Sequence, residues 1–242
     1  MFFDLSGVLY DGEALIPGAV ETVEAVRSLG MTLRFVTNTA TQSRAQILRK
    51  LQRMDIPLRD DELFTAPMAA LARVKKMGLR PYCLIHEQLK ADFEVIDQQS
   101  PNAVVLGDAR EDLTFTHLNR AFQIVQKGGP LIAIGYNRYF REEGALMLDA
   151  GPFVKALEWA ADVQAVVTGK PSADFFQEVV ASTGMSAEQC LMIGDDAEAD
   201  VAAAVSAGLG GCLVKTGKYE PGDEKKLPEG AEVLPSVAGL CA

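Results

Sequence analysis

Residues 2–12 read Phe-Phe-Asp-Leu-Ser-Gly-Val-Leu-Tyr-Asp-Gly, and this stretch decides the expected fold. A short apolar run ends on the carboxylate of Asp4, and a serine and a glycine follow, which predicts a strand that ends in a tight turn. In open α/β sheets, ligands bind at the carboxyl ends of the strands. A carboxylate buried there is costly unless a cation or hydrogen-bond donors meet it. We therefore expect the rest of the chain to supply such partners.

Length and charge limit what the protein can be. The 242 residues suffice for one large or two small domains, and the net charge of −10 argues against nucleic acid as a partner. The sequence lacks a signal-peptide pattern and an apolar run long enough to span a bilayer, so we expect a cytoplasmic protein with no membrane partner. Only three residues precede Asp4, which is short for a central strand, so the strand is truncated or the natural start lies upstream of Met1.

Apolar runs alternate with helical periodicity along most of the chain. This alternation predicts an α/β fold with a doubly wound, mostly parallel Rossmann-like sheet and a second, inserted α/β unit. The expected helices cover residues 18–29, 42–54, 66–77, 114–126, 151–160, 173–182 and 198–207. The expected strands cover residues 31–36, 81–86, 103–107, 130–134, 165–169, 189–194 and 210–214.

Polar residues follow several of these strands. Asp4, the pair Thr37-Asn38 and the pair Asp195-Asp196 each come directly after an apolar run, and Lys170 follows another. The carboxyl ends of parallel strands share one edge of a sheet, so we expect these side chains to gather there.

The first of these residues suit phosphate chemistry. The carboxylate of Asp4 could attack phosphorus as a nucleophile or bind a metal, although an aspartate before a glycine-rich turn is also a common turn residue. Thr37 and Asn38 could hold a phosphate oxygen, but both are also good helix caps. Lys170 could neutralise a phosphate, or it could be an ordinary exposed lysine.

Three further acids favour a metal site. Asp195, Asp196 and Asp200 follow an apolar strand closely, and such acids repel one another unless a cation joins them. A few oxygen ligands beside a substrate phosphate are typical of Mg²⁺. The alternative is that these acids lie in the first turn of a helix, where the helix dipole favours them.

The order D-x-S-G, T-N, K-P and G-D-D-x₃-D resembles the haloacid dehalogenase superfamily of aspartyl-phosphate hydrolases, type IIA cap subgroup. The resemblance implies a hydrolase core of residues 1–78 and 164–242, and a smaller α/β cap domain of residues 79–163 inserted into it. It also implies Mg²⁺ as cofactor, a small phosphorylated substrate and a possible homodimer. Residues 4–11, 78–82, 146–152 and the motif Thr216-Gly217-Lys218 narrow the resemblance to a branch that acts on P–N and P–O–P bonds.

The resemblance also implies a role for each site residue. Asp4 would be the nucleophile and, with the Ser6 carbonyl and Asp195, a ligand of Mg²⁺. Thr37, Asn38 and Lys170 would bind the phosphate, while Asp196 and Asp200 would orient water on the metal.

Ser6 departs from the usual pattern of the superfamily, in which an aspartate protonates the leaving group. A serine hydroxyl is a poor general acid, and such help is typically worth about 10²–10⁴-fold. We therefore expect good leaving groups to be favoured, as in pyrophosphate, phosphoramidates and aryl or acyl phosphates. The alternatives are a general sugar or nucleotide phosphatase, and a phosphate-binding scaffold with weak catalysis.

One segment of the expected cap could recognise the leaving group of the substrate. Residues 135–141 are polar, cationic and aromatic, so Arg138 or Arg141 could bind an anion there. A solvated loop is the alternative. The aspartate that Ser6 replaces would also activate water, and the sequence identifies neither a substitute for it nor the physiological substrate.

Overall fold

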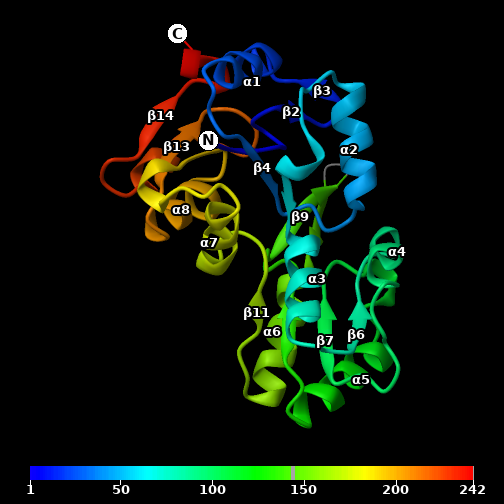
Figure 1. Ribbon diagram of the computed structural model, residues 1–242. Coiled ribbons are helices and arrows are strands. Elements are labelled where there is room, and N and C mark those ends of the chain that lie inside the picture. Colours follow the sequence, from blue (N-terminus) through cyan, green and yellow to red (C-terminus); the bar gives the residue numbers. More distant parts are fainter. Residues whose placement is uncertain (143–144, 242) are drawn as a thin grey trace. The chain divides into compact units, whose positions relative to one another are not determined.

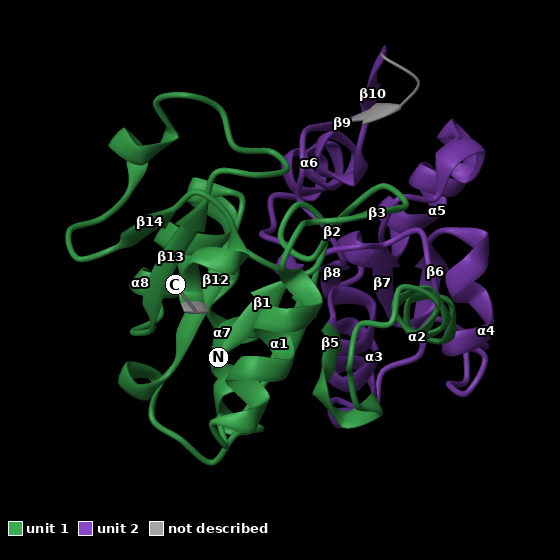
Figure 2. Ribbon diagram, turned by 90° about the horizontal axis from the view of Figure 1, so that it is seen from above, with its two compact units in different colours: residues 1–37, 45–64, 170–242 green, residues 38–44, 65–169 purple. Residues whose placement is uncertain are grey.

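The computed structural model describes residues 1–142 and 145–241, apart from the side chains of Arg141, Glu142 and Cys241. It divides into two compact units (Figures 1 and 2). The first unit comprises Met1–Thr37, Ala45–Phe64 and Lys170–Ala242, and the second comprises Asn38–Arg44 and Thr65–Gly169.

A six-stranded sheet forms the centre of the first unit, in the order β14-β13-β12-β1-β4-β5. Strand β1 lies between β12 and β4 and is parallel to both. The strands are β1 (Phe2–Asp4), β4 (Arg34–Thr37), β5 (Leu63–Thr65), β12 (Leu191–Gly194), β13 (Gly210–Val214) and β14 (Glu232–Leu234). The helices are α1 (Ala19–Ser28), α2 (Arg44–Arg53), α7 (Ala173–Ala181) and α8 (Ala203–Ser206), with a π-helical segment at Ala197–Ala202 before α8.

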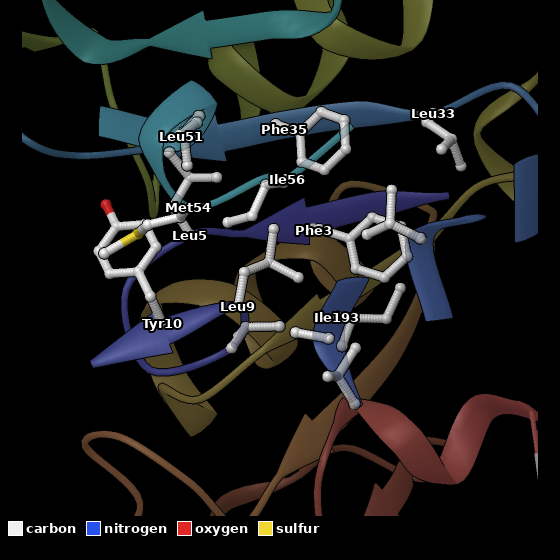
Figure 3. Packing of buried hydrophobic residues seen from close by; sticks show 14 of the residues in the cluster. Phe3, Leu5, Leu9, Tyr10, Leu33, Phe35, Leu51, Met54, Ile56 and Ile193 are labelled. Carbon is white, nitrogen blue, oxygen red and sulfur yellow. The ribbon is translucent and has the colours of Figure 1, made fainter. Parts of the chain in front are cut away.

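Side-chain alternation along β1 builds the core of this unit. Phe3 and Phe35 face the same side of the sheet and stack with ring centroids 5.8 Å apart. Leu51 of helix α2, Met54 just after that helix and Ile193 of β12 lie in the same buried cluster (Figure 3). Burying large apolar side chains in this way contributes about 1.5–3 kcal/mol for each of them. The core therefore fixes β1, and with it the carboxylate at its end.

The second unit has its own four-stranded parallel sheet, in the order β11-β8-β7-β6. Val104 and Leu106 pack on one side with α5 and α6, whereas Val105 packs on the other side with α3. This period of two is expected for a strand that is buried on both faces. The elements are α3 (Ala66–Lys76), β6 (Pro81–Leu84), α4 (Lys90–Phe93), β7 (Ala103–Leu106), α5 (Phe115–Gln126), β8 (Leu131–Ala133), α6 (Ala150–Ala161) and β11 (Val166–Val167).

The observed architecture confirms the expected α/β class with mostly parallel sheets and two α/β units. The boundaries differ from the expected 78/79 and 163/164. Helix α3 belongs to the second unit because Ala66, Ala70 and Val74 pack against the apolar side chains of β7 and β8. Strand β11 also belongs there, since it pairs with β8.

Several short elements were not expected from the sequence. Hairpins form from β2 (Tyr10–Asp11) with β3 (Ala14–Leu15) and from β9 (Tyr139–Glu142) with β10 (Ala145–Leu148). Strands β5 and β14 are also additions, and the expected helix 198–207 begins in π-helical form. Short 3-10 segments cover Asp60–Glu62, Glu87–Leu89, Arg110–Asp112, Ala187–Gln189, Asp223–Lys226 and Val237–Cys241. Within the described residues, every helix is too short or too polar to cross a bilayer.

Candidate active site

The expected edge of the first unit's sheet carries a cluster of acids. Asp4 is the last residue of β1, and Asp195 follows β12, which is the parallel neighbour of β1. Asp200 joins them from the π-helical segment, and carboxylate oxygens of the three residues lie within 4.8 Å of one another. All three residues are buried.

Lys170 brings positive charge into this cluster. Its Nζ lies 2.6 Å from Asp4 Oδ1 and 2.5 Å from Asp200 Oδ1, and the residue is only 4% exposed. Burial alone would lower the pKa of this ammonium group, but the charges of Asp200 and Asp4 outweigh burial and raise the pKa. Lys170 is therefore a buried, charged partner of Asp4 and not an exposed surface lysine.

One ammonium group does not balance three carboxylates. Burial raises the pKa of the Asp195 and Asp200 carboxyl groups, and the charge of Asp4 raises both further. When all are ionised, the three carboxylates and Lys170 leave two negative charges. A divalent cation would balance this charge, and an all-oxygen donor set fits Mg²⁺. The residues present thus fit the expected metal.

Two glycines permit loops to reach Asp195. Gly7 and Gly217 have φ angles of 83° and 62°, and a Cβ on either residue would overlap the Asp195 carboxylate. A side chain is disfavoured here both by the left-handed backbone and by the space available. Ser6 precedes Gly7 and is exposed, and its backbone bridges to Tyr10.

Sequence reasoning assigned no role to the loop after β13, although its Thr216-Gly217-Lys218 motif was a signal. The Thr216 hydroxyl donates to the Gly7 carbonyl at 2.5 Å, and the Lys218 backbone N–H donates to Asp195 Oδ2 at 2.7 Å. This loop therefore holds both the turn after Asp4 and the carboxylate of Asp195.

Asp196 and Asp200 are placed differently, although both were expected to support metal-bound water. Asp200 lies inside the carboxylate cluster and accepts the Asp196 backbone N–H at 3.2 Å. The Asp196 side chain instead caps the π-helical segment, accepting from the backbone N–H groups of Glu198 and Ala199. The Asp196 side chain therefore lies at the start of a helical segment, close to the alternative in which these acids occupy a helix N-terminus.

The expected phosphate-binding residues are divided between the units. Thr37 ends β4 in the first unit, where it is buried beside the strand that carries Asp4. Asn38 belongs to the second unit, where its side-chain oxygen lies against Gly169. Arg138 also belongs to the second unit and is exposed, and its carbonyl accepts the Asp149 N–H at 3.3 Å. The side chain of Arg141 lies outside the described part of the structure.

Comparison with known proteins agrees with this arrangement. Residues 1–99 match a family model described as haloacid dehalogenase-like hydrolase, and residues 167–240 match a HAD-hydrolase-like model. Haloacid dehalogenase-like hydrolase domain-containing protein 2 from Bos taurus is 43% identical over 224 residues, which cover 93% of this chain and 86% of that protein. Phospholysine phosphohistidine inorganic pyrophosphate phosphatase from Xenopus laevis is 42% identical over 233 residues, with the same coverage of 93% and 86%.

Solved structures give the same result. A 4-nitrophenylphosphatase from Thermotoga maritima superposes with a TM-score of 0.89 at 28% identity, covering 99% of this chain and 94% of that one. A p-nitrophenyl phosphatase from Archaeoglobus fulgidus superposes with a TM-score of 0.90 at 25% identity, covering 99% and 97%. The sequence, the fold and the acidic edge of the sheet lead to one conclusion: this chain belongs to the haloacid dehalogenase-like hydrolase family.

Proposed function

We propose that the protein is a Mg²⁺-dependent phosphohydrolase that acts through an aspartyl-phosphate on Asp4 and favours small substrates with good leaving groups. The observation that carries this proposal is the contact of 2.6 Å between the buried ammonium of Lys170 and the carboxylate of Asp4, within a cluster of three acids. A purely structural turn aspartate would need neither a buried cation nor two neighbouring acids.

The chemistry follows from these groups. One Asp4 oxygen bonds to phosphorus while the bond to the leaving oxygen or nitrogen breaks, and the leaving group takes the electron pair. Lys170 offsets negative charge on Asp4 and on the incoming phosphoryl group, and Thr37 and Asn38 are proposed to bind its oxygens. Water then attacks phosphorus, which frees Asp4 and releases inorganic phosphate.

Asp4, Asp195 and the carbonyl of Ser6 are the proposed ligands of Mg²⁺. The bound ion would neutralise charge and orient the phosphate. Asp200 contacts Lys170 and accepts the backbone N–H of Asp196. We therefore propose that Asp200 holds these two groups in place beside the ligands of Mg²⁺ and is not itself a ligand. Asp196 contributes by fixing the start of the π-helical segment.

Ser6 supports the preference for good leaving groups. Its exposed hydroxyl cannot supply a proton at neutral pH as a carboxylic acid does. The alkoxide of an alkyl phosphate needs that proton in order to leave. The phosphate released from pyrophosphate and the aryloxide released from an aryl phosphate leave as stabilised anions without it. Relatives named for pyrophosphate, phospholysine and phosphohistidine, and neighbours named for nitrophenyl phosphate, are consistent with this selectivity. Arg138, in the second unit, is proposed to bind an anionic leaving group.

The test compares pyrophosphate, 4-nitrophenyl phosphate and glycerol phosphate, each with and without Mg²⁺. We expect phosphate release from the first two, a rate at least about a hundredfold lower for glycerol phosphate, and loss of activity with a chelator. Asp4→Asn should abolish turnover, because an amide does not attack phosphorus.

The matched control is Asp97→Asn, the same isosteric change at an exposed turn where the side-chain oxygen accepts the Gln99 N–H. It should retain full activity. An active Asp4→Asn protein would overturn the nucleophile. A folded wild-type protein that binds phosphate but hydrolyses none of the substrates would favour the scaffold alternative.

A homodimer and a cytoplasmic location complete the proposal. Exposed apolar side chains of the second unit, among them Phe115 and Trp159, are candidates for a surface buried between two copies. Analytical ultracentrifugation would detect the dimer, and fractionation of cells would test the location.

A further inference from the structure

Lys50 of helix α2 makes polar contacts with the hairpin that follows Asp4. Strands β2 and β3 pair in antiparallel register and leave Gly12 and Glu13 as the turn between them. Lys50 Nζ donates to the Gly12 carbonyl at 2.7 Å and lies 3.2 Å from Glu13 Oε1. It also lies 4.3 Å from the centroid of the Tyr10 ring. One ammonium group therefore contacts both residues of the turn and the first residue of β2.

These contacts differ in strength. The Lys50 side chain is 13% exposed, whereas Glu13 is 78% exposed, so the ion pair is weakened by solvent. The hydrogen bond to the Gly12 carbonyl is also exposed, whereas the cation–π contact is made with the ring of the buried residue Tyr10. The contact with Tyr10 is therefore the one least weakened by solvent. Tyr10 itself packs in the core with Leu51 of the same helix and with Met54, which follows the helix (Figure 3). The hairpin is therefore joined to this helix by the polar contacts of Lys50 as well as by the apolar packing of Tyr10.

The hairpin is in turn continuous with the loop at the active site. The Gly7 N–H donates to the Tyr10 carbonyl at 2.6 Å, and the Leu9 N–H donates to the Leu5 carbonyl at 2.9 Å. The Gly7 carbonyl accepts the Thr216 hydroxyl, and Gly7 lies against Asp195. A displacement of Tyr10 would therefore move Gly7 and Ser6 relative to Asp195.

We propose that Lys50 is a positioning residue that holds the loop of Ser6 and Gly7 in the conformation needed for metal binding and phosphoryl transfer. This inference rests on the proposed function, because it assigns the Ser6 carbonyl to Mg²⁺. The ammonium group of Lys50 contacts Tyr10, Gly12 and Glu13, and none of these three residues belongs to the acidic cluster or is a proposed ligand of the metal.

The first measurement requires neither metal nor substrate. Hydrogen exchange of the Gly7, Leu9 and Tyr10 amides is compared between wild type and Lys50→Met, which keeps an unbranched side chain of similar length. We expect exchange at least about tenfold faster in the variant, because local opening of the hairpin costs less without the ammonium contacts. Lys50→Arg, which retains the charge and the donors, should restore slow exchange.

The second measurement is the Mg²⁺ dependence, read from calorimetric titration and from turnover of 4-nitrophenyl phosphate. Lys50→Met should bind Mg²⁺ at least about fivefold more weakly and lower kcat, because small displacements at an active site have large effects on rate. Arg49→Met removes an exposed charge from the same helix and should change both quantities less than twofold.

The outcomes separate this inference from the proposed function. Unchanged amide exchange in Lys50→Met would show that Lys50 does not hold the loop of Ser6 and Gly7, and would overturn the inference. Faster exchange with unchanged Mg²⁺ binding overturns the positioning role, because it leaves Lys50 with a purely structural one. A wild-type protein that binds Mg²⁺ but hydrolyses no phosphate refutes the proposed function, and the calorimetric comparison then still tests the inference.

Discussion

Removing the charge of Lys170 provides a direct test of the electrostatics at the sheet edge. In Lys170→Met, a side chain of similar length replaces an ammonium that lies 2.6 Å from Asp4 and 2.5 Å from Asp200. Breaking a buried ion pair by removing one partner costs about 3–5 kcal/mol of unfolding free energy, because the remaining charge stays buried without compensation. For a chain of this length, each kcal/mol shifts Tm by about 2–4 °C, so we expect a decrease of roughly 6–20 °C.

The assay is a thermal melt followed by circular dichroism at neutral pH, in a chelator and again in Mg²⁺. The decrease should be smaller in Mg²⁺, since a bound divalent ion compensates the same carboxylates. The double variant Lys170→Met/Asp200→Asn should regain part of the loss, because it removes one of the unpaired charges.

The control is Lys226→Met, because Lys226 is 53% exposed and pairs with Asp223 at the surface. Removing such a surface pair costs at most about 1 kcal/mol. If Lys170→Met melts within about 1 °C of wild type in the chelator, the cluster is not held by charge compensation, and the reasoning is refuted.

Two further predictions concern leaving groups and pH. Ser6→Asp should raise turnover of glycerol phosphate relative to pyrophosphate by at least about tenfold, because it supplies a general acid, and an unchanged ratio would contradict the role given to Ser6. Burial alone would raise the pKa of Glu62, but Arg27 and Arg59 outweigh burial and hold the pKa below its usual value. The stability from these pairs is therefore present above the unfolded-state pKa of about 4.3 and lost as pH falls through the lower folded-state pKa. Urea melts between pH 6 and pH 3 should show this loss in wild type and a weaker pH dependence in Glu62→Gln.

Much of the fold and of the acidic edge could be predicted from local pattern. The apolar runs before Asp4 and Asp195 indicate buried strands, and parallel strands bring their ends together, so the meeting of these two residues followed from topology. Lys170 was expected at the same edge because it follows an apolar strand, but that strand, β11, pairs with β8 in the other sheet. The contact between Lys170 and Asp4, 166 residues apart, therefore does not follow from strands of one sheet.

Other features depend on tertiary contacts that no local pattern carries. Helix α3 has an apolar face that could pack on either unit, and only the packing with β7 and β8 assigns it to the second one. The short strands of the β2–β3 hairpin contact Lys50, and Tyr10 packs against Leu51 and Met54. These partners lie about 40 residues further along the chain, beyond the reach of a local pattern. Asp196 and Asp200 have similar sequence settings, and their different roles arise from the π-helical turn that directs one inward and the other toward backbone N–H groups.

The hydrogen bond from Thr216 to the Gly7 carbonyl joins residues 209 positions apart, and β1 has β12 as one of its two neighbours. During synthesis, the N-terminal segment leaves the ribosome first and must wait for more than three quarters of the chain before these partners exist. A nascent or truncated chain that stops before residue 191 would therefore expose the edge of β1 and hold none of the acids that accompany Asp4. The acidic cluster therefore assembles only after the segment that carries Asp195, Asp200 and Thr216 has been synthesised.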